Sequence, residues 1–341
     1  MQSVKNNYYH IVVILGVNKR SMKLSVLVPA YNLQDYISEC LLSVLQQDTN
    51  FEYEVIVCDD ASPDHTKNKI EQLALYYPVK LKSIFKSVNA GLAANMQTLL
   101  ARATGEYIAY LDGDDVALPG KLQQQVDHLD NHHDCHMVFH ESDMFDSHTK
   151  QTIKLYSKAF YNWSYIPPRS TVEHMILYGT YMQASSVMFR RHEQLLETVA
   201  KDCEIIFDYP FYINNAGYLN ANVDFIPQVL GRYRIHPDSF GGQTSRSFSR
   251  RERSLTDIEN ACRGAKYFGI ADEVIERGIA HHRFAAALYF LQRSENLLFR
   301  KYIELSACTD SFFDAKHNNV WQLRNDPKAL SVLLLSKFQV K

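Results

Sequence analysis

Two groups of aspartates follow apolar runs of the sequence, at positions where their carboxylates could bind a cation. Asp59-Asp60 follows Tyr53–Cys58, and Asp112-Gly113-Asp114-Asp115 follows Tyr107–Leu111. Both runs predict short buried strands, and a parallel α/β sheet collects its ligand groups at the carboxyl ends of its strands. Carboxylates gathered there repel one another unless a cation lies among them, and a divalent cation that carries a phosphate ester would supply that charge. The pattern indicates an enzyme that handles a nucleoside diphosphate.

Composition and charge are those of an ordinary folded protein. Of the 341 residues, 46% are hydrophobic and 22% are charged, and the formal net charge is -2, so no overall charge favours nucleic acid or acidic lipid. The 6 cysteines show no Cys-x-x-Cys spacing, which is typical of a reduced, cytoplasmic protein. The sequence has no apolar run of the roughly 18 residues that a spanning helix needs. The histidines from His128 to His140 lack the spacing of a metal site, so an exposed helix end is predicted there.

The first 21 residues precede the first clear strand. Their apolar run from Ile11 to Val17 is too short to span a membrane, and Lys19 and Arg20 follow it where a secretory signal would have small residues. Residues 1–21 are therefore predicted to be a dispensable N-terminal extension. An extra edge strand at Ile11–Leu15 is the structural alternative.

Strand and helix patterns alternate in the first half of the sequence. Strands are predicted at 24–28, 53–58, 79–85, 107–111 and 137–140, and helices at 34–46, 62–76, 91–103 and 119–131. Short links between such elements favour a parallel sheet with right-handed crossovers. Because the strands are nearly continuous apolar runs, helices should cover both faces of the sheet.

The pattern changes after about residue 145. The sequence predicts an aromatic loop at 160–169, a strand at 185–189 followed by a helix, a short helix at 209–216, and one or two strands at 223–235. From residue 245 onward it predicts mainly helix, with a boundary at Gly241-Gly242. Four arginines near the start of this region could meet anionic lipid or form a solvated helix face. They are Arg246, Arg250, Arg251 and Arg253.

Four motifs occur in one order along the chain. They are Val28-Pro29-Ala30-Tyr31-Asn32, Asp59-Asp60-Ala61-Ser62, Asn89-x-Gly91-x-x-x-Asn95 and Gly105-Glu106-Tyr107-Ile108-Ala109-Tyr110-Leu111-Asp112-Gly113-Asp114-Asp115. Together they resemble the motif set of family 2 glycosyltransferases with the GT-A fold, over roughly residues 23–240. One such motif alone would be a weak signal, whereas four in order at one sheet edge are a strong one.

The resemblance implies an α/β fold of the GT-A type. This is a Rossmann-like, mixed but mainly parallel sheet flanked by helices, with a helical segment at the C-terminus. The implied divisions are an extension at 1–21, a GT-A glycosyltransferase domain at 22–240 and a helical region at 241–341.

The resemblance also implies a donor site. Tyr31 can stack on a base, and Asp60 is implied to accept the imide N–H of uracil, while Asp59 orients the loop or the ribose. Gly91 permits close backbone approach at a helix N-terminus, which favours anionic groups. A plain turn, a helix cap and a simple helix start are the alternatives for these motifs. The implied nucleotide-sugar-binding residues are Pro29, Ala30, Tyr31, Asn32, Asp60, Asn89, Gly91, Asn95, Asp112, Gly113 and Arg234.

A metal site is expected at the acidic motif. Asp112 and Asp114 are alternate residues, so their carboxylates can converge on one ligand. Hard Mn²⁺ or Mg²⁺ takes carboxylate oxygens and keeps diphosphate oxygens as further ligands. The resemblance implies that Asp114, Asp112 and His236 hold the metal, with Asp114 as the nearer ligand. A turn without metal, and a histidine that merely packs, are the alternatives.

A catalytic base is expected downstream. Phe207-Asp208-Tyr209-Pro210-Phe211 opens a short helix, and Tyr233-Arg234-Ile235-His236-Pro237-Asp238-Ser239 follows a strand. This arrangement resembles the acidic base and the Arg-x-His-x-x-Ser segment of the family, so Asp208 matches the catalytic aspartate. Many members have Glu-Asp where this chain has Phe207-Asp208. A helix N-cap is the alternative for Asp208.

The expected activity is a metal-dependent, inverting transfer of a hexosyl or N-acetylhexosaminyl group from a nucleoside diphosphate sugar, UDP-linked, to a hydroxyl. The acceptor would be a surface polysaccharide or a lipid-linked oligosaccharide. The protein would be cytoplasmic, and peripheral contact with the inner face of a membrane is a further expectation. Homodimerisation is also expected. A sugar nucleotidyltransferase would need a Gly-rich phosphate loop after the first strand, which is absent, as is the dinucleotide-binding Gly-x-Gly-x-x-Gly. A non-catalytic sugar-nucleotide-binding protein is the alternative from another class.

Overall fold

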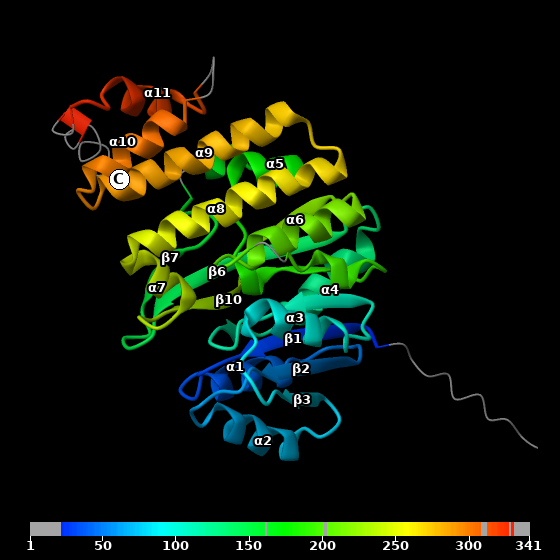
Figure 1. Ribbon diagram of the computed structural model, residues 1–341. Helices are drawn as coiled ribbons and strands as arrows, with labels where there is room; N and C mark the ends of the chain where they lie inside the picture. The colour runs from blue at the N-terminus through cyan, green and yellow to red at the C-terminus, as the bar shows by residue number, and fades with distance from the viewer. Residues whose placement is uncertain (1–21, 161, 201–202, 308–311, 327–328, 331–341) are drawn as a thin grey trace, which may run out of the picture.

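The computed structural model describes residues 22–160, 162–200, 203–307, 312–326 and 329–330, and Figure 1 shows them as a ribbon. The predicted extension at residues 1–21 and its alternative strand at Ile11–Leu15 lie outside the described residues.

A single mixed sheet organises the described chain, in the strand order β3-β2-β1-β4-β9-β6-β10-β5. Its parallel half consists of β1 (Leu24–Ala30), β2 (Tyr53–Asp59), β3 (Leu81–Phe85) and β4 (Tyr107–Tyr110). The other half contains β5 (Val116–Ala117), β6 (Met137–Asp146), β9 (Met188–Arg190) and β10 (Val223–Ile235), with β7 (Thr152–Leu155) and β8 (Arg169–Ser170) paired to β6 and β10. Strand β9 runs antiparallel to both β4 and β6, while β10 is parallel to β6. The expected mixed, mainly parallel core is confirmed.

Helices cover both faces of the sheet because successive residues of a strand point to opposite sides. In β1, Val26 and Val28 belong to one hydrophobic cluster and Leu27 belongs to the other. The first cluster packs against α1 (Ile37–Leu45), α2 (Thr66–Tyr76) and α4 (Lys121–Asn131). The second packs against α3 (Gly91–Leu100), α5 (Val172–Tyr178) and α6 (Asp208–Leu219).

Short elements account for most of the differences from the expected pattern. The predicted helix after residue 190 is only the 3-10 turn Leu195–Thr198, and the expected strand at 185–189 begins with the 3-10 turn Ala184–Ser186. Two further 3-10 turns, Trp163–Tyr165 and Ala265–Phe268, lie in the aromatic loop and after α8. The one or two strands expected at 223–235 form the single strand β10, which shifts register against β6 near its proline.

The C-terminal region is helical in its described part. It contains α7 (Phe240–Arg246), α8 (Phe248–Gly264), α9 (Asp272–Leu291), α10 (Asn296–Leu305) and α11 (Ala315–Gln322). Figure 1 shows α8 to α11 at the end of the molecule opposite β3 and α2, with α8 above α6 and with α5 beside α9, whereas α7 lies lower, near β10. Ile258 and Ile279 from this region share a hydrophobic cluster with Ile108 of β4. The helices therefore share a core with the sheet, and a boundary at residues 240–241 stays a prediction.

The four arginines of the expected basic cluster do not form one exposed face. Arg246 and Arg253 are exposed, whereas Arg250 and Arg251 are partly buried. Arg246 donates to the carbonyl of Gly242, and Arg253 lies 3.7 Å from Glu204. Within the described residues, no helix combines the length and the apolar character needed to cross a membrane.

Candidate active site

The carboxyl ends of three neighbouring parallel strands bring the sequence motifs together. The register pairs Ala30 of β1 with Asp59 of β2, and Leu27 of β1 with Tyr110 of β4. The segments that follow these strands therefore leave the sheet side by side. Ligands of open α/β sheets bind at such an edge.

The turn after β1 is fastened to the turn after β2. The backbone N–H of Asn32 donates to the Ser62 hydroxyl at 2.8 Å, and that hydroxyl donates to the Asp59 carboxylate at 2.5 Å. Asp59 therefore orients the loop. Pro29 and Ala30 are buried within β1, so only the Tyr31-Asn32 part of this motif reaches the surface, with Tyr31 47% exposed.

The carboxylate of Asp60 is occupied by groups of the protein. It is 2% exposed, accepts from the backbone N–H groups of Ala90 and Gly91, at 2.8 Å for Gly91, and lies 3.1 Å from the Lys86 ammonium. A negative charge at the start of α3 satisfies its free N–H groups and suits the helix dipole. In this structure Asp60 occupies the N–H group of Gly91, and the predicted contact of Gly91 with an anionic donor stays a prediction.

The rest of the third motif builds the loop. The Asn89 side chain accepts from the Gly91 N–H at 3.1 Å, and Gly91 has φ +85, a conformation that favours glycine. Asn95 is 2% exposed and donates to the Cys58 carbonyl at 2.8 Å. A direct contact of Asn95 with a nucleotide is not supported, because its side chain lies inside the molecule and ties α3 to β2.

The acidic motif is a tight turn between β4 and β5. The Asp115 N–H donates to the Asp112 carbonyl at 3.0 Å, so the side chains are placed by this turn and not by strand alternation. A Cβ on Gly113 would lie 2.9 Å from the Pro29 carbonyl and 2.7 Å from Leu33. Glycine is needed there because the turn lies directly against the end of β1. The predicted nucleotide contact of Gly113 has no separate support, since Gly113 is buried.

The end of β10 holds this turn from the other side. His236 Nε2 lies 2.9 Å from Asp114 Oδ2. The buried Arg234 donates its backbone N–H to Asp115 at 2.9 Å, its Nε to the Asp114 carbonyl at 2.6 Å and an Nη to Glu39 at 2.6 Å. Arg234 thus lies beneath the acidic turn and supports it, and its Nη1 is buried without a hydrogen-bond partner.

The acidic turn carries excess negative charge. Burial and the neighbouring carboxylates of Asp115 and Asp114 raise the pKa of Asp112 well above its ordinary value. Burial and Asp114 also raise the pKa of Asp115, although Ser185, the Arg234 N–H and Gln183 donate hydrogen bonds to it. Charged partners inside the protein do not fully compensate these carboxylates.

Asp208 lies within electrostatic reach of the acidic turn. Burial raises its own pKa, and its charge contributes to the raised pKa values of Asp112 and Tyr110. Asp208 is the first residue of α6, whose N-cap is Phe207. The backbone N–H groups of Asp208 and Tyr209 lower the pKa of the Asp208 carboxyl against the effect of burial, so its role at the helix start stays an alternative to that of a base.

Phe207 stands where the resemblance leads us to expect the glutamate of a Glu-Asp pair, and its side chain is packed among aromatic rings. Its ring stacks on Tyr110 with centroids 6.4 Å apart and on Phe211 at 5.1 Å. Tyr110 is the last residue of β4, and its hydroxyl donates to Asp112. An apolar residue before Asp208 thus packs the start of α6 against the strand that leads into the acidic turn.

The residues at this edge fit a divalent cation. Asp112 and Asp114 offer carboxylate oxygens, the donor type that Mn²⁺ and Mg²⁺ prefer, and His236 adds an imidazole nitrogen beside them. His236 is 5% exposed, and its Nδ1 is buried without a hydrogen-bond partner. The uncompensated charge of the turn and this unpartnered nitrogen both agree with a cation site.

A second group of possible ligands lies away from this edge. Ligand atoms of His128, Cys135 and Asp224 lie within 4.8 Å of one another. Arg169 already donates to Asp224 at 2.6 Å and 2.8 Å, and burial raises the pKa of the Cys135 thiol to about 12. A guanidinium bound to the carboxylate and a protonated thiol would both compete with a metal, and the expected absence of a metal at these histidines stays a prediction.

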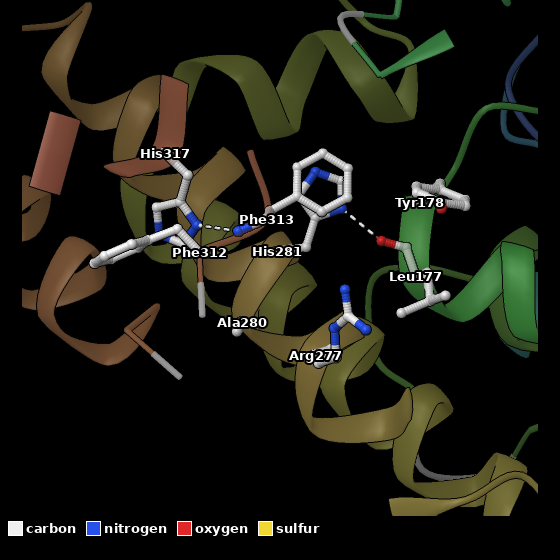
Figure 2. A pocket seen from close by; sticks show the side chains of 8 residues that line it. All are labelled: Leu177, Tyr178, Arg277, Ala280, His281, Phe312, Phe313 and His317. Atoms are coloured by element: carbon white, nitrogen blue, oxygen red, sulfur yellow. Dashed lines mark hydrogen bonds between the residues drawn. The ribbon is translucent and has the colours of Figure 1, made fainter. Parts of the chain in front are cut away.

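A small pocket of about 30 Å³ lies between the end of α5 and the C-terminal helices, and Figure 2 shows the side chains that line it. His281 contacts the Leu177 carbonyl at 2.6 Å, and the His317 ring accepts from the Phe313 N–H. The pocket has room for about one water molecule. It contains no residue of the acidic turn.

Several site residues carried no clear sequence signal. The buried Lys121 donates to the Ser185 carbonyl, and burial lowers its pKa to about 8. Tyr36 packs its ring 4.6 Å from that of His236. These residues occur in segments whose patterns predict only helix or loop. The others that support the acidic turn are Glu39, Tyr110, Gln183 and Ser185.

Comparison with known proteins points to one family. The family model described as glycosyl transferase family 2 matches residues 25–197. An uncharacterized protein of Mycobacterium tuberculosis is 30% identical over 218 residues, which are 62% of this chain and 59% of that protein. UDP-Glc:alpha-D-GlcNAc-diphosphoundecaprenol beta-1,3-glucosyltransferase WfgD of Escherichia coli is 35% identical over 102 residues, 30% of this chain and 39% of that protein.

A solved structure shares the fold. The crystal structure of residues 1–349 of S. aureus TarS in complex with UDP-GlcNAc has a TM-score of 0.60 at 20% identity and covers 90% of this chain and 88% of that chain. The chain spans less than two thirds of the length of the curated relatives it matches.

Proposed function

Because this chain belongs to glycosyl transferase family 2, we propose that it is a metal-dependent, inverting glycosyltransferase that moves a sugar from a UDP-linked donor to a hydroxyl. The observation that carries this proposal is the contact of His236 with Asp114 in the acidic turn, where the Asp112 carboxylate feels the charges of both Asp114 and Asp208. One side of the site can hold a charged leaving group, and the other offers a carboxylate to the acceptor.

The donor is proposed to lie over the ends of β1 and β2. Tyr31 is 47% exposed there and can stack on the base. Asp60 is buried and fixes the neighbouring loop, so we propose that its effect on the base acts through that loop as well as through its acceptor oxygens. The relative WfgD is named for a UDP-Glc donor, and the TarS structure contains UDP-GlcNAc. These names support a UDP-linked hexosyl or N-acetylhexosaminyl group.

Asp114, Asp112 and His236 are the residues that would hold Mn²⁺ or Mg²⁺. When bound, such a cation stabilises the negative charge of a leaving diphosphate. Arg234 holds the Asp114 carbonyl and the Asp115 carboxylate in place, so these residues need little reorganisation to receive it. Asp115 and Gly113 shape the turn and are not proposed as ligands.

Asp208 is proposed to take the proton of the acceptor hydroxyl. A raised pKa brings a carboxylate closer to the pH at which a general base works well. With one base and no protein nucleophile in the proposal, the hydroxyl attacks the anomeric carbon in a single displacement, which inverts the anomer. The name of WfgD includes a diphosphoundecaprenol-linked sugar, which supports a lipid-linked or surface polysaccharide acceptor.

A donor screen tests the proposal directly. Purified protein with Mn²⁺ should show a higher melting temperature with UDP-sugars than with GDP- or dTDP-sugars, because binding to the folded state stabilises it. Donor turnover should require the metal and disappear with EDTA. No donor hydrolysis or transfer under any of these conditions would favour a non-catalytic sugar-nucleotide-binding protein instead.

A further inference from the structure

A cavity of about 240 Å³ lies among the helices above the sheet. Its walls come from α8, α9, the end of α5 and the loop before β8, and include Arg251, His281, His282, Tyr178 and Phe160. Its volume is several times the roughly 30 Å³ that a water molecule occupies in the liquid. The cavity therefore has room for a small ligand group.

Arg251 is the cation of this cavity, and within the described residues no carboxylate is paired with it. Its Nε is buried and has no hydrogen-bond partner. The residues that line the cavity include no aspartate or glutamate. Holding a partly buried guanidinium without an anionic partner is unfavourable, so an anion bound beside Arg251 would be stabilised.

The carboxylates of helix α8 are all engaged elsewhere. Glu252 accepts from Lys301 and Tyr302, and Glu259 accepts from Arg283. Asp257 accepts from the backbone N–H groups of Ile205 and its neighbours. None of the three is available to neutralise the arginine on the same helix.

The surroundings of Arg251 add positive charge. The Tyr289 ring lies 5.1 Å from the Arg251 guanidinium and 3.8 Å from that of Arg293. Burial lowers the pKa of His281 to about 4 and that of His282 to about 3, so both imidazoles are neutral at pH 7 and bring no further charge. An anion entering the cavity would meet a cation, and none of the residues that line the cavity is an aspartate or a glutamate.

We propose that this cavity binds a phosphate group, with the Arg251 guanidinium as its ionic partner. A guanidinium fits the oxygens of a phosphate with parallel, charge-assisted hydrogen bonds. Phe160 and Tyr178 line the same cavity and offer aromatic surface to whatever the phosphate carries.

The cavity wall is connected to the start of α6. Tyr209, which follows Asp208, lies 3.1 Å from His282 through its hydroxyl. On the other side, Tyr156 donates to the Thr180 carbonyl at 3.3 Å, and the charge of Asp208 contributes to the raised pKa of Tyr156. We therefore assign the phosphate to the acceptor; this assignment rests on the proposed function, whereas phosphate binding itself does not.

Titration calorimetry with inorganic phosphate at constant ionic strength and pH 7 tests the site. The affinity should fall by about tenfold or more in Arg251→Met, because a charge-assisted hydrogen bond is lost. Without phosphate, this variant should melt at the same temperature as the wild type or higher, since a partly buried charge without an anionic partner has been removed. Arg253→Met is the matched control on the same helix and should bind phosphate normally, because Arg253 is exposed beside Glu204.

Two further calorimetry experiments distinguish this site from the donor site and identify the kind of molecule that carries the phosphate. Asp114→Asn should keep phosphate binding, which places the signal outside the donor site. Decyl phosphate below its micelle concentration should bind more tightly than inorganic phosphate if the acceptor is lipid-linked, and no more tightly if it is a soluble phosphate; either result supports the site.

Equal phosphate affinity in the wild type and Arg251→Met would overturn the proposal, and so would equal binding of acetate and phosphate. If Arg251→Met does not fold, Arg251→Lys takes its place in the test. Lysine keeps the positive charge but lacks the planar guanidinium that can form two parallel hydrogen bonds, so this variant should bind phosphate more weakly than the wild type. Donor turnover is measured separately, so a failure of the proposed transferase activity is distinguishable from a failure of this site.

Discussion

His236 at the end of β10 lies 2.9 Å from Asp114 in the turn after β4, although 122 residues separate them in the sequence. Arg234, two residues earlier on β10, holds the backbone of the same turn. The last strand of the sheet thus completes a site that the first four strands begin. Any change that moves the end of β10 should therefore affect the acidic turn.

The first prediction concerns this pair. Asp114→Asn should reduce Mn²⁺ affinity and donor turnover by at least about 100-fold, because a neutral amide replaces a charged ligand oxygen. Calorimetry with Mn²⁺ and an assay of donor hydrolysis would measure both. Asp272→Asn is the control, because Asp272 is exposed in a surface ion pair. Near wild-type metal affinity in Asp114→Asn would contradict the assignment.

The second prediction concerns Asp208. Asp208→Asn should lower turnover by roughly 10²–10⁴-fold, the range typical of general-base loss. Its affinity for UDP with Mn²⁺ should change little, because Asp208 is proposed to contact the acceptor and not the nucleotide. Proton NMR of the early product should show an anomer inverted relative to the donor. A retained anomer, or a variant that also loses UDP binding, would show that Asp208 has another role.

The third prediction follows from the raised pKa of Asp208. In the folded state this carboxyl keeps its proton to a higher pH than in the unfolded state, so its free energy contribution to stability falls as pH rises above the ordinary value of about 3.9. Asp208→Asn should therefore melt at a higher temperature than the wild type at pH 8, and the difference should shrink toward pH 4.

The same shift predicts the pH dependence of turnover. At saturating Mn²⁺, kcat/KM of the wild type should rise as Asp208 loses its proton, with a midpoint above the ordinary pKa of an aspartate. Two results would contradict this account. One is a rise of kcat/KM with its midpoint at the ordinary pKa of an aspartate, and the other is an Asp208→Asn variant that is less stable than the wild type at pH 8.

The fourth prediction concerns Asp60 as the organiser of the loop before α3. Asp60→Ala should destabilise the fold by roughly 3 kcal/mol, because it leaves the largely buried Lys86 ammonium and two backbone N–H groups without their acceptor. Urea unfolding would measure the loss. Asp60→Asn keeps an acceptor oxygen and should lose less. Equal stability of the alanine variant and the wild type would rule out this role.

The fifth prediction uses a pair of glycines. Gly113→Ala should displace the acidic turn and lower both Mn²⁺ affinity and turnover, because its Cβ would lie 2.9 Å from the Pro29 carbonyl. Gly264→Ala is the matched control, since a Cβ there meets nothing within 4 Å, and it should stabilise α8 by up to about 1 kcal/mol. If Gly113→Ala retains full metal affinity, the close contact does not constrain the turn.

The sequence by itself predicted which edge of the sheet carries the candidate site. Apolar runs that end in Asp59-Asp60 and Asp112–Asp115 predict strands whose carboxyl ends share one edge, and β1, β2 and β4 meet in that way. The alternating strand and helix patterns also predicted helices on both faces of the sheet. These features depend on local periodicity and on the parallel register, so they can be read without knowing which distant residues pack together.

Only the tertiary structure decided what individual side chains do there. Asn95 and Asp60 occur in motifs that resemble nucleotide contacts, yet Asn95 is buried against β2 and Asp60 holds the start of α3. Arg251 occurs in a run of arginines that predicts an exposed face, yet it lines a cavity. The environment of each of these side chains is made by elements far away in the chain, and their packing sets which polar groups are buried and which partners they find.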